Sequence, residues 1–418
     1  MRGDGVKTIV AADLFCGAGG TSTGMAEAVT AAGGRLELTA VNHWDVAVAT
    51  HGRNHPGQRH FCASLDALNP HQLFPAGKLD LLWASPECTH HSRARGGRPR
   101  QDQSRATAWC VVRWAEALRP KVVLVENVPE FLEWGPLTKL GKPDKRKRGA
   151  LFRAWVSALQ AAGYRVEHRL LCAADYGDPT SRTRLFIQAS RGAIHWPEPT
   201  HGKSAAVRWR AAREVIDWSV EGTSIFRRRR PLAANTLKRI MKGVRKFGGA
   251  PFVVAWDHQS SAGVWSQDEP LSTVTTKARH GVVQPFVLGQ QSRSAPRSVD
   301  EPLPTVATSG GISLIDAFLV PYYGTSGAAS VDAPLPTVTC LPRFGLAQPS
   351  VTVDGEKYLL DIRFRMLQPS ELAKAQGFPG DYVFTGTKKD VCRQIGNAVP
   401  CGLSRALVRA VIPTIWRA

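Results

Sequence analysis

Residues 79–93 of the chain read Leu-Asp-Leu-Leu-Trp-Ala-Ser-Pro-Glu-Cys-Thr-His-His-Ser-Arg. The apolar first half is typical of a buried strand, which ends at Pro86 because proline cannot continue a central strand ladder. Cys88 follows this break and precedes a loop rich in arginine and glycine. Neighbouring cations favour the thiolate form of cysteine, and α/β enzymes place their chemistry at the carboxyl ends of strands. Cys88 is therefore a candidate nucleophile, with a buried structural cysteine as the alternative.

Strand and helix patterns alternate on both sides of this stretch. Strands are predicted at 8–12, 36–41, 79–84, 121–125, 164–172 and 184–187, and helices at 104–118 and 150–162. This alternation predicts an α/β fold with a doubly wound, mainly parallel sheet that carries helices on both faces. Helical patterns return after about residue 359, where a helix at 369–376 and a final helix are predicted.

A repeat rich in proline and threonine separates these two helical and strand-forming parts. Glu-Pro-Leu-Ser-Thr-Val at 269–274 recurs as Glu-Pro-Leu-Pro-Thr-Val at 301–306 and as Ala-Pro-Leu-Pro-Thr-Val at 333–338, a spacing of 32 residues. Each unit is predicted to form a turn, a short Thr-Val element and a short strand. We therefore predict a discontinuous α/β domain at 1–190 and 346–418, with a smaller, irregular, β-rich domain inserted at 191–345.

The charge of the chain favours a polyanionic partner. Its 54 Lys and Arg residues against 34 Asp and Glu residues give a net charge of +20 and a pI near 10.0. The positive residues gather at 93–105, 139–148 and 227–246. Local clusters of this kind are typical of a nucleic-acid-binding surface, although a merely soluble basic protein remains the alternative.

The eight cysteines include no Cys-x-x-Cys pair, which argues against a zinc site and against a disulfide framework. The first residues contain no apolar signal region, and no run approaches 18 apolar residues. These features predict an intracellular, reducing setting without a membrane partner and without a bound metal.

Two further strand ends carry candidate site residues. The turn Phe15–Gly20 follows the first predicted strand and would let the backbone approach a nucleotide-like ligand at a helix N-terminus. Asp13, just before this turn, either holds an ammonium group or caps the turn. Glu126 follows another strand on the same rim as Cys88, where a partly buried, protonated carboxyl would donate to a ring nitrogen; a local cap is the alternative.

Together these motifs resemble those of the cytosine-5 DNA methyltransferases, which use S-adenosylmethionine. The similar segments are Asp13–Gly20, Ser85–Cys88, Glu126–Val128, Arg182–Arg184, Arg365–Pro379 and Gln394–Pro400. They occur in the family's order and cover about residues 8–190 and 359–402. The resemblance implies a Rossmann-like methyltransferase fold with the repeat region as its target-recognition domain.

The resemblance also implies a mechanism on double-stranded DNA. Cys88 would add to C6 of a cytosine that has been flipped out of the duplex, which places electron density on C5. Glu126 would hydrogen-bond N3 and the exocyclic amine, while Arg182 and Arg184 would steady the base and the adjacent backbone. The methyl group would pass from S-adenosylmethionine to C5, leaving S-adenosylhomocysteine. Cys16, the rival thiol, is expected to pack in the cofactor turn.

The cofactor site implied by the resemblance contains residues from several loops. Its candidates are Asp13, Phe15, Gly17, Gly19, His43, Trp44, Ser64, Asp66, Pro86, Asn397 and Ala398. Trp44 is expected to stack on the adenine. His43 occupies the place of the family's ribose-binding acid, or is an ordinary surface histidine. The family binds the adenine amine with an aspartate. In this chain that position holds Ser64, unless the aspartate is shifted to Asp66.

The chain departs from the family pattern beside the nucleophile, where Glu87 and Thr89 replace the usual proline and glutamine. A carboxylate next to the thiol would raise its pKa unless the nearby cations offset the effect. Two alternatives therefore stay open: an RNA cytosine-5 methyltransferase of the same fold, and a DNA-binding relative that has lost catalysis. The favoured reading is a monomer in the cytoplasm of a bacterial or phage-infected cell, near the nucleoid, with a possible cognate restriction endonuclease.

Overall fold

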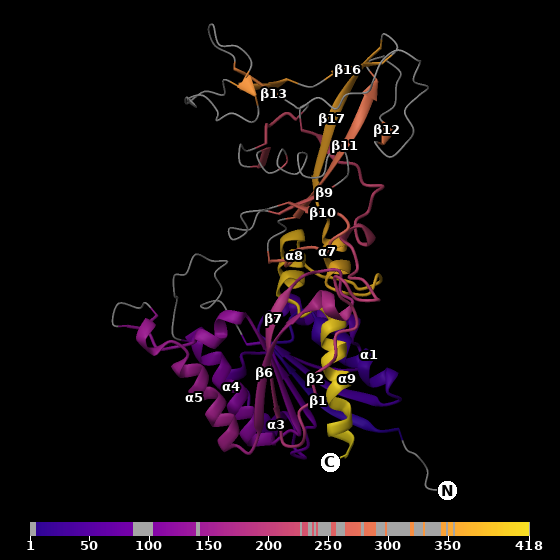
Figure 1. Ribbon diagram of the computed structural model, residues 1–418. Coiled ribbons are helices and arrows are strands. Elements are labelled where there is room, and N and C mark those ends of the chain that lie inside the picture. Colours follow the sequence, from indigo (N-terminus) through magenta and orange to yellow (C-terminus); the bar gives the residue numbers. More distant parts are fainter. Residues whose placement is uncertain are drawn as a thin grey trace.

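The structure is a computed structural model of the 418-residue chain. It describes residues 6–86, 103–138, 143–225, 228–232, 236–237, 240, 252–255, 264–276, 280–289, 297–298, 318–321, 329–330, 344–347, 350–353 and 356–417. Two bodies stand one above the other in Figure 1: a layered α/β body and a slender β-rich body.

Seven strands form the sheet of the α/β body. They are β1 (Thr8–Leu14), β2 (Arg35–Asn42), β3 (Arg59–Cys62), β4 (Leu81–Ala84), β5 (Val122–Asn127), β6 (Arg165–Cys172) and β7 (Thr183–Ser190). Their order is β3-β2-β1-β4-β5-β7-β6, and β7 alone among them runs antiparallel to its neighbours. The predicted mainly parallel, doubly wound sheet is confirmed. The strand order reverses between β1 and β4, and ligands bind beyond the carboxyl ends of strands at such a point.

Helices cover both faces of this sheet. They are α1 (Gly20–Ala31), α2 (Asp45–Asn54), α3 (Pro70–Leu73), α4 (Gln103–Leu118), α5 (Ala150–Ala161) and α9 (Cys401–Arg417). Side chains of β1 alternate between two cores: Ile9 packs with α1 and α9, whereas Leu14 packs with α4 and α5. Residues buried on both faces explain why the strand sequences are almost continuously apolar.

The end of the chain returns to this body through α9. Its side chains pack on α1, and the Ser404 hydroxyl donates to the Gly20 carbonyl oxygen at 3.3 Å. The Asp178 carboxylate accepts from the backbone N–H groups of Gly402 and Leu403 at the start of α9. By length and composition alone, the stretch Lys388–Arg417 would pass for a membrane-spanning helix, but 67% of its most apolar window is buried inside the protein. Packing in the core accounts for its apolar composition.

The β-rich body contains two further antiparallel sheets. One comprises β8 (Thr223–Ser224), β9 (Phe252–Ala255), β10 (Val264–Ser266), β11 (His280–Gly289), β12 (Arg297–Ser298), β16 (Ser350–Val353) and β17 (Glu356–Met366). The other comprises β13 (Phe318–Pro321), β14 (Ala329–Ser330) and β15 (Phe344–Ala347). The predicted Phe-Val strands of the repeat correspond to β9, β11 and β13, while the repeat copies at 301–306 and 333–338 lie outside the described residues.

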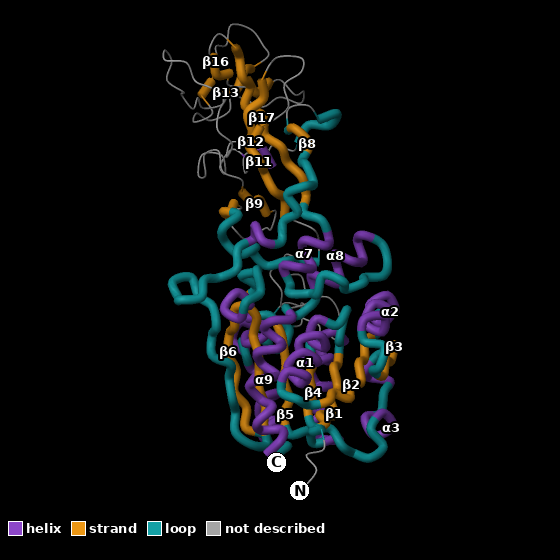
Figure 2. Tube along the Cα trace, turned by 90° about the vertical axis from the view of Figure 1, so that its right-hand side faces the viewer, coloured by secondary structure: helices purple, strands orange, loops and turns teal. Residues whose placement is uncertain are grey.

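The two bodies meet at α7 (Pro369–Ala375) and α8 (Lys388–Asn397), which Figure 2 shows between them. β17 pairs with β11 from Tyr358 to Met366, so residues 350–366 belong to the sheet of the β-rich body. The sequence-based division placed the start of the second α/β segment at residue 346. By strand pairing, the chain leaves the β-rich body only after Met366.

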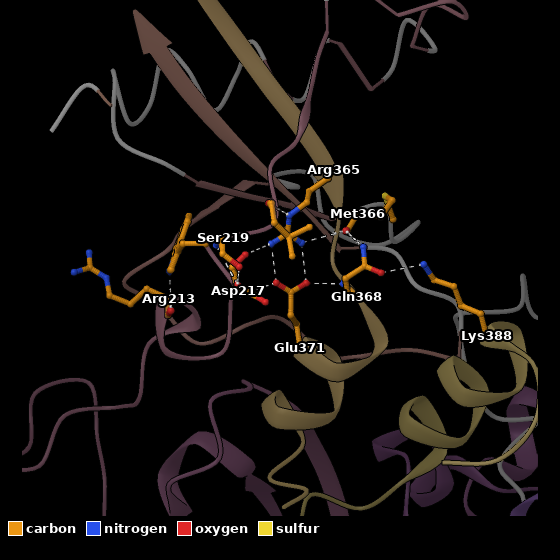
Figure 3. Close-up of polar contacts among 10 residues, drawn as sticks. Arg213, Asp217, Ser219, Arg365, Met366, Gln368, Glu371 and Lys388 are labelled. Carbon is orange, nitrogen blue, oxygen red and sulfur yellow. Dashed lines mark hydrogen bonds and ion pairs between the residues drawn. The ribbon is translucent and has the colours of Figure 1, made fainter. Parts of the chain in front are cut away.

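A buried ion pair fixes this exit from the β-rich body. Arg365, at the end of β17, donates from both terminal nitrogens to the two carboxylate oxygens of Glu371 on α7, at 2.8 Å each (Figure 3). The side chains are only 8% and 2% exposed. Arg365 also donates to the Asp217 and Val220 carbonyl oxygens, and Glu371 accepts from the Asp217 N–H. The segment around Asp217 is therefore joined to the β17–α7 connection, about 150 residues later, at one carboxylate.

We expect Glu371→Gln to lower the free energy of unfolding by about 3–5 kcal/mol, because it leaves the buried Arg365 guanidinium without its counter-charge. Chemical denaturation measures this change. Glu37→Gln is the control, since Glu37 pairs with Arg35 on the surface and its loss should cost no more than about 1 kcal/mol. Equal losses in the two variants would contradict the role given to the buried pair.

Candidate active site

The predicted site residues gather at the carboxyl edge of the seven-stranded sheet. Asp13 pairs with Ala40 of β2 and Trp83 of β4, so the turns after these strands begin at the same level. The Asn127 side chain, at the end of β5, donates to the Pro86 carbonyl oxygen at 3.3 Å. β7 runs the other way, which brings its first residues to this same edge.

The glycine-rich turn after β1 has the backbone that its sequence predicted. Phe15, Gly17 and Gly19 all have positive φ angles, of 62°, 55° and 100°. A Cβ on Gly19 would lie 2.5 Å from the Tyr382 hydroxyl oxygen, and one on Gly20 would lie 2.4 Å from the Val399 carbonyl oxygen. Only glycine fits these two positions without displacing a neighbour. The turn is thus built for close backbone approach, at the N-terminus of α1.

Asp13 lies beneath this turn. Its side chain has no exposed surface, and its Oδ2 accepts a 2.6 Å hydrogen bond from the Ser22 hydroxyl on α1. Its Oδ1 has no hydrogen-bond partner among the described residues. Burial raises the pKa of Asp13 to about 7, against the lowering effect of Ser22. A buried carboxyl with a free oxygen suits a nearby cation better than it suits capping of the turn.

Cys16 is not a good nucleophile in this setting. It is buried in the turn, and burial together with the Asp13 charge raises the pKa of its thiol well above the usual value. The thiol would therefore stay protonated at neutral pH. Its geometry matches the expectation that it packs within the cofactor turn.

The loops after β2 and β3 contain four more of the predicted cofactor residues. His43 is exposed and Trp44 is half-buried, with the Arg393 guanidinium 4.3 Å from the Trp44 ring centre. Arg393 therefore lies against the Trp44 ring in a cation–π contact.

Ser64 and Asp66 differ in their surroundings. The Asp66 carboxylate accepts a 3.0 Å hydrogen bond from the Cys110 thiol on α4, and burial followed by this bond raises the pKa of Cys110 to about 12. Ser64 is exposed at the beginning of the same short 3-10 turn. Both residues are exposed, and Asp66 alone of the two has an oxygen engaged by α4.

Glu126 and two arginines form the polar centre of the edge. The Glu126 carboxylate lies 3.4 Å from the Arg184 Nε, and both side chains are largely buried. Burial raises the pKa of Glu126, although the positive charges of Arg184 and Arg182 oppose the rise. The side chain can therefore hold a proton and give a hydrogen bond to a ring nitrogen, rather than serving only as a local cap.

Other predicted residues have clear positions as well. Pro86 is buried where the strand ends, Asn397 is exposed as the last residue of α8, and Ala398 is buried just after it. Cys88, with Glu87 and Thr89, lies outside the described residues. No group of three or more metal-binding side chains occurs within the part of the chain that the structure describes.

The family model for C-5 cytosine-specific DNA methylase matches residues 9–413, nearly the whole chain. The chain belongs to this family. Among curated relatives of this methylase, M.AgeI, a type II methyltransferase of Thalassovita gelatinovora, is 32% identical over 212 residues, or 48% of this chain and 44% of the relative. M.SacI, a type II methyltransferase of Streptomyces achromogenes, is 24% identical over 96% of this chain and 91% of its own length. The match to M.AgeI thus spans less than half of that protein.

Solved structures show the same fold for this methylase. The Entamoeba histolytica methyltransferase EhMeth superposes with a TM-score of 0.53 at 13% identity, over 97% of this chain and 98% of its own. The S. pombe Dnmt2 methyltransferase superposes with a TM-score of 0.52 at 14% identity, over 97% of this chain and 99% of its own. At such low identity the likeness concerns the fold alone.

The structure also has a feature that the sequence did not reveal: the first clear repeat copy docks at the carboxyl edge of the seven-stranded sheet. Leu271 exchanges backbone hydrogen bonds with Pro179 and Ser181, and Arg182 donates to the Val274 carbonyl oxygen at 3.0 Å. Leu271 and Val274 are 1% exposed, in a core shared with α7 and α8. The conformation of the docked copy is therefore tied to one of the predicted base-holding arginines.

Gly396 allows this docking. A Cβ there would lie 2.2 Å from the Thr275 carbonyl carbon and 2.3 Å from the Thr276 nitrogen, which are backbone atoms. The Gly-Asn-Ala-Val-Pro motif thus contacts the inserted body with its glycine and the cofactor turn with Val399. The motif itself was visible in the sequence, but its partner 120 residues earlier was not.

We expect Gly396→Ala to destabilise the protein by about 1–3 kcal/mol, because the added methyl group must displace backbone rather than a flexible side chain. Thermal unfolding measures the loss, and methyl transfer to DNA should fall with it as the Arg182 contact shifts. Gly380→Ala is the matched control, since its Cβ would meet nothing within 4 Å. If both variants unfold at the same temperature, the docking contact does not have this role.

Proposed function

We propose that the chain is a DNA (cytosine-5)-methyltransferase that acts on a cytosine flipped out of duplex DNA. The observation that carries the proposal is the largely buried group of Glu126, Arg184 and Arg182 at the edge where β4 leads to Cys88. C5 of cytosine is a poor nucleophile, so the reaction needs both an attacking thiolate and stabilisation of the ring charge. The buried group at this edge would stabilise the ring charge, and Cys88 would provide the thiolate.

The residues of the chain divide the work between them. The Cys88 thiolate would attack C6, and the electron pair of the C5–C6 double bond would move into the ring, where a hydrogen bond from Glu126 to N3 stabilises it. S-Adenosylmethionine supplies the methyl group that C5 takes. Loss of the C5 proton to a base would then restore the double bond and expel the Cys88 thiolate.

The glycine-rich turn and neighbouring loops fit this cofactor. The left-handed turn offers backbone N–H groups at the start of α1, Trp44 offers an aromatic ring in the loop after β2, and Asp13 places a carboxyl beneath the turn. S-Adenosylmethionine carries positive charge, so a carboxylate at this depth would favour it. His43, Ser64, Asn397 and Ala398 complete the proposed site, with Asp66 holding the loop to α4.

We further propose that the β-rich body reads duplex DNA, since it is inserted into the α/β body and docks beside the base-holding arginines. The curated relatives M.AgeI and M.SacI are type II methyltransferases, which supports a partnership with a cognate restriction endonuclease. A monomer in the cytoplasm of a bacterial or phage-infected cell, close to the nucleoid, completes the proposal.

Duplex DNA containing 5-fluorocytosine tests the reaction directly. Fluorine cannot leave C5 as a proton does, so the protein should form a covalent adduct that requires S-adenosylmethionine and maps to Cys88. Cys88→Ala should form none. An adduct with tRNA instead of duplex DNA would favour the RNA alternative, and intact DNA binding without any adduct would favour an inactive relative. An adduct at Cys16 would place the nucleophile elsewhere.

We expect Glu126→Gln to lower kcat by roughly 10²- to 10⁴-fold, because an amide cannot transfer a proton to the ring nitrogen. Affinity for S-adenosylmethionine should not change, since Glu126 lies outside the glycine-rich turn. Single-turnover kinetics and equilibrium binding measure the two quantities separately. Glu116→Gln, an exposed carboxylate on α4, serves as the control. Loss of cofactor affinity in Glu126→Gln would contradict this assignment.

A further inference from the structure

A continuous chain of hydrogen bonds leads from Asp13 to a partly exposed histidine. The Ser22 hydroxyl lies 2.6 Å from Asp13 Oδ2 and 2.8 Å from His51 Nε2. His51 Nδ1 lies 2.8 Å from His60 Nε2. Ser22 and His51 have no exposed surface, whereas His60 on β3 is half-buried. The chain therefore connects the carboxyl beneath the cofactor turn with solvent.

The direction of these hydrogen bonds depends on the charge of Asp13. When Asp13 is ionised it can only accept, so Ser22 donates to it, His51 Nε2–H donates to Ser22, and His60 Nε2–H donates to His51. When Asp13 is protonated, each donor and acceptor exchanges its role. Loss of the Asp13 proton moves one proton outward at each link, and one proton leaves at His60 Nδ1. Both states satisfy every link, which an isolated buried carboxyl could not do.

The groups around the chain keep its members neutral. Burial, then the charges of His55 and His60, lowers the pKa of His51 well below its usual value; burial also lowers the pKa of His55 to about 4 and lowers the pKa of His60. The other titratable groups that interact with Asp13 are Cys16 in its own turn and Tyr382 from the loop after α7, and burial raises the pKa of both. Asp13 is thus the member whose charge changes near neutral pH.

Two of the histidines also support the turn itself. The Tyr382 hydroxyl donates to the Ala18 carbonyl oxygen and lies 3.4 Å from His55 Nε2, which in turn lies 3.3 Å from the Thr23 hydroxyl. A Cβ built on Gly19 would lie 3.1 Å from the His51 ring and 3.1 Å from the His55 ring, so both rings lie against the turn. His55 is therefore next to the chain without being a link of it.

We propose that Ser22, His51 and His60 are positioning residues that set the charge of Asp13, so that binding of the positively charged cofactor at the turn releases a proton through this chain. The inference rests on the proposed use of S-adenosylmethionine. Asp13 has no exposed surface, so it acts on the cofactor through its charge beneath the turn rather than by an open contact. Ser22 is a positioning residue because it acts through Asp13.

Titration calorimetry of the full chain with S-adenosylmethionine, in two buffers of different ionisation enthalpy, counts the protons released. Because Asp13 titrates near pH 7 in the free protein, about half a proton should be released at pH 7, more at pH 6 and almost none at pH 9. Affinity should accordingly fall about tenfold for each pH unit below 6. S-Adenosylhomocysteine lacks the sulfonium charge and should release fewer protons at the same pH.

Variants separate the chain from its surroundings. Asp13→Asn should release no proton from this site at any pH, and Ser22→Ala should move the release curve to higher pH, because the ionised Asp13 loses its donor. His51→Leu should move it in the same direction. His71→Gln is the matched control, because His71 is exposed on α3 and is no link of this chain, and its release curve should coincide with that of the unaltered protein.

Two outcomes would overturn the inference while leaving the proposed function intact: cofactor binding without proton release between pH 6 and 8, or a Ser22→Ala curve that coincides with the unaltered one. Failure of S-adenosylmethionine to bind at any pH would instead contradict the proposed function. Circular dichroism of each variant confirms that it is folded before its protons are counted.

Discussion

The buried ion pair between Arg365 and Glu371 determines how the two bodies of this methylase are joined. A carboxylate and a guanidinium that are almost fully removed from water must satisfy each other, and the remaining donors and acceptors must find backbone partners. Here those partners are the Asp217 and Val220 backbone groups. The strand that leaves the β-rich body, the helix that follows it and the segment that enters that body are consequently held at one point.

Arg182 lies on the α/β body but contacts the inserted body. The predicted role of the arginine is to steady the base, but in the free protein it donates to the Val274 carbonyl oxygen of the docked repeat copy. The same copy is pressed against Gly396 of the motif that also contacts the cofactor turn. The catalytic edge is therefore completed by residues from the inserted body, and its geometry follows that body's position.

The sequence predicted the sheet and the edge because each depends on local patterns. These patterns are the continuous apolar strands, the glycines at 17 and 19 and the Pro86 that ends a strand. Each determines the conformation of only a few neighbouring residues, so it can be recognised in the sequence. The docking of Leu271 and Val274, by contrast, depends on contacts with Pro179–Arg182, and nothing local in a Pro-Leu-Ser-Thr-Val segment indicates this distant partner. The predicted domain boundary at residue 346 has the same limitation, because the sequence of β17 does not show to which body the strand belongs. Only its pairing with β11 assigns it to the β-rich body.

His51 shows a third limit of sequence reasoning. It lies in an ordinary helical stretch, and its meaning arises only when α2 brings it between Ser22 and His60. A histidine in such a place reads as a core residue by pattern alone.

The packing of α9 on α1 has a consequence for synthesis of the protein. Ser404 contacts Gly20 across 384 positions of chain, so the core that supports the cofactor turn cannot close until the last helix has left the ribosome. Contacts this distant in sequence close slowly, because the entropy of a long loop must be overcome first. One apolar face of the seven-stranded sheet therefore stays uncovered while the inserted body is synthesised. Translation that stops before α9 would leave a strand-rich fragment whose sheet exposes to water the apolar face that α9 covers, which favours aggregation.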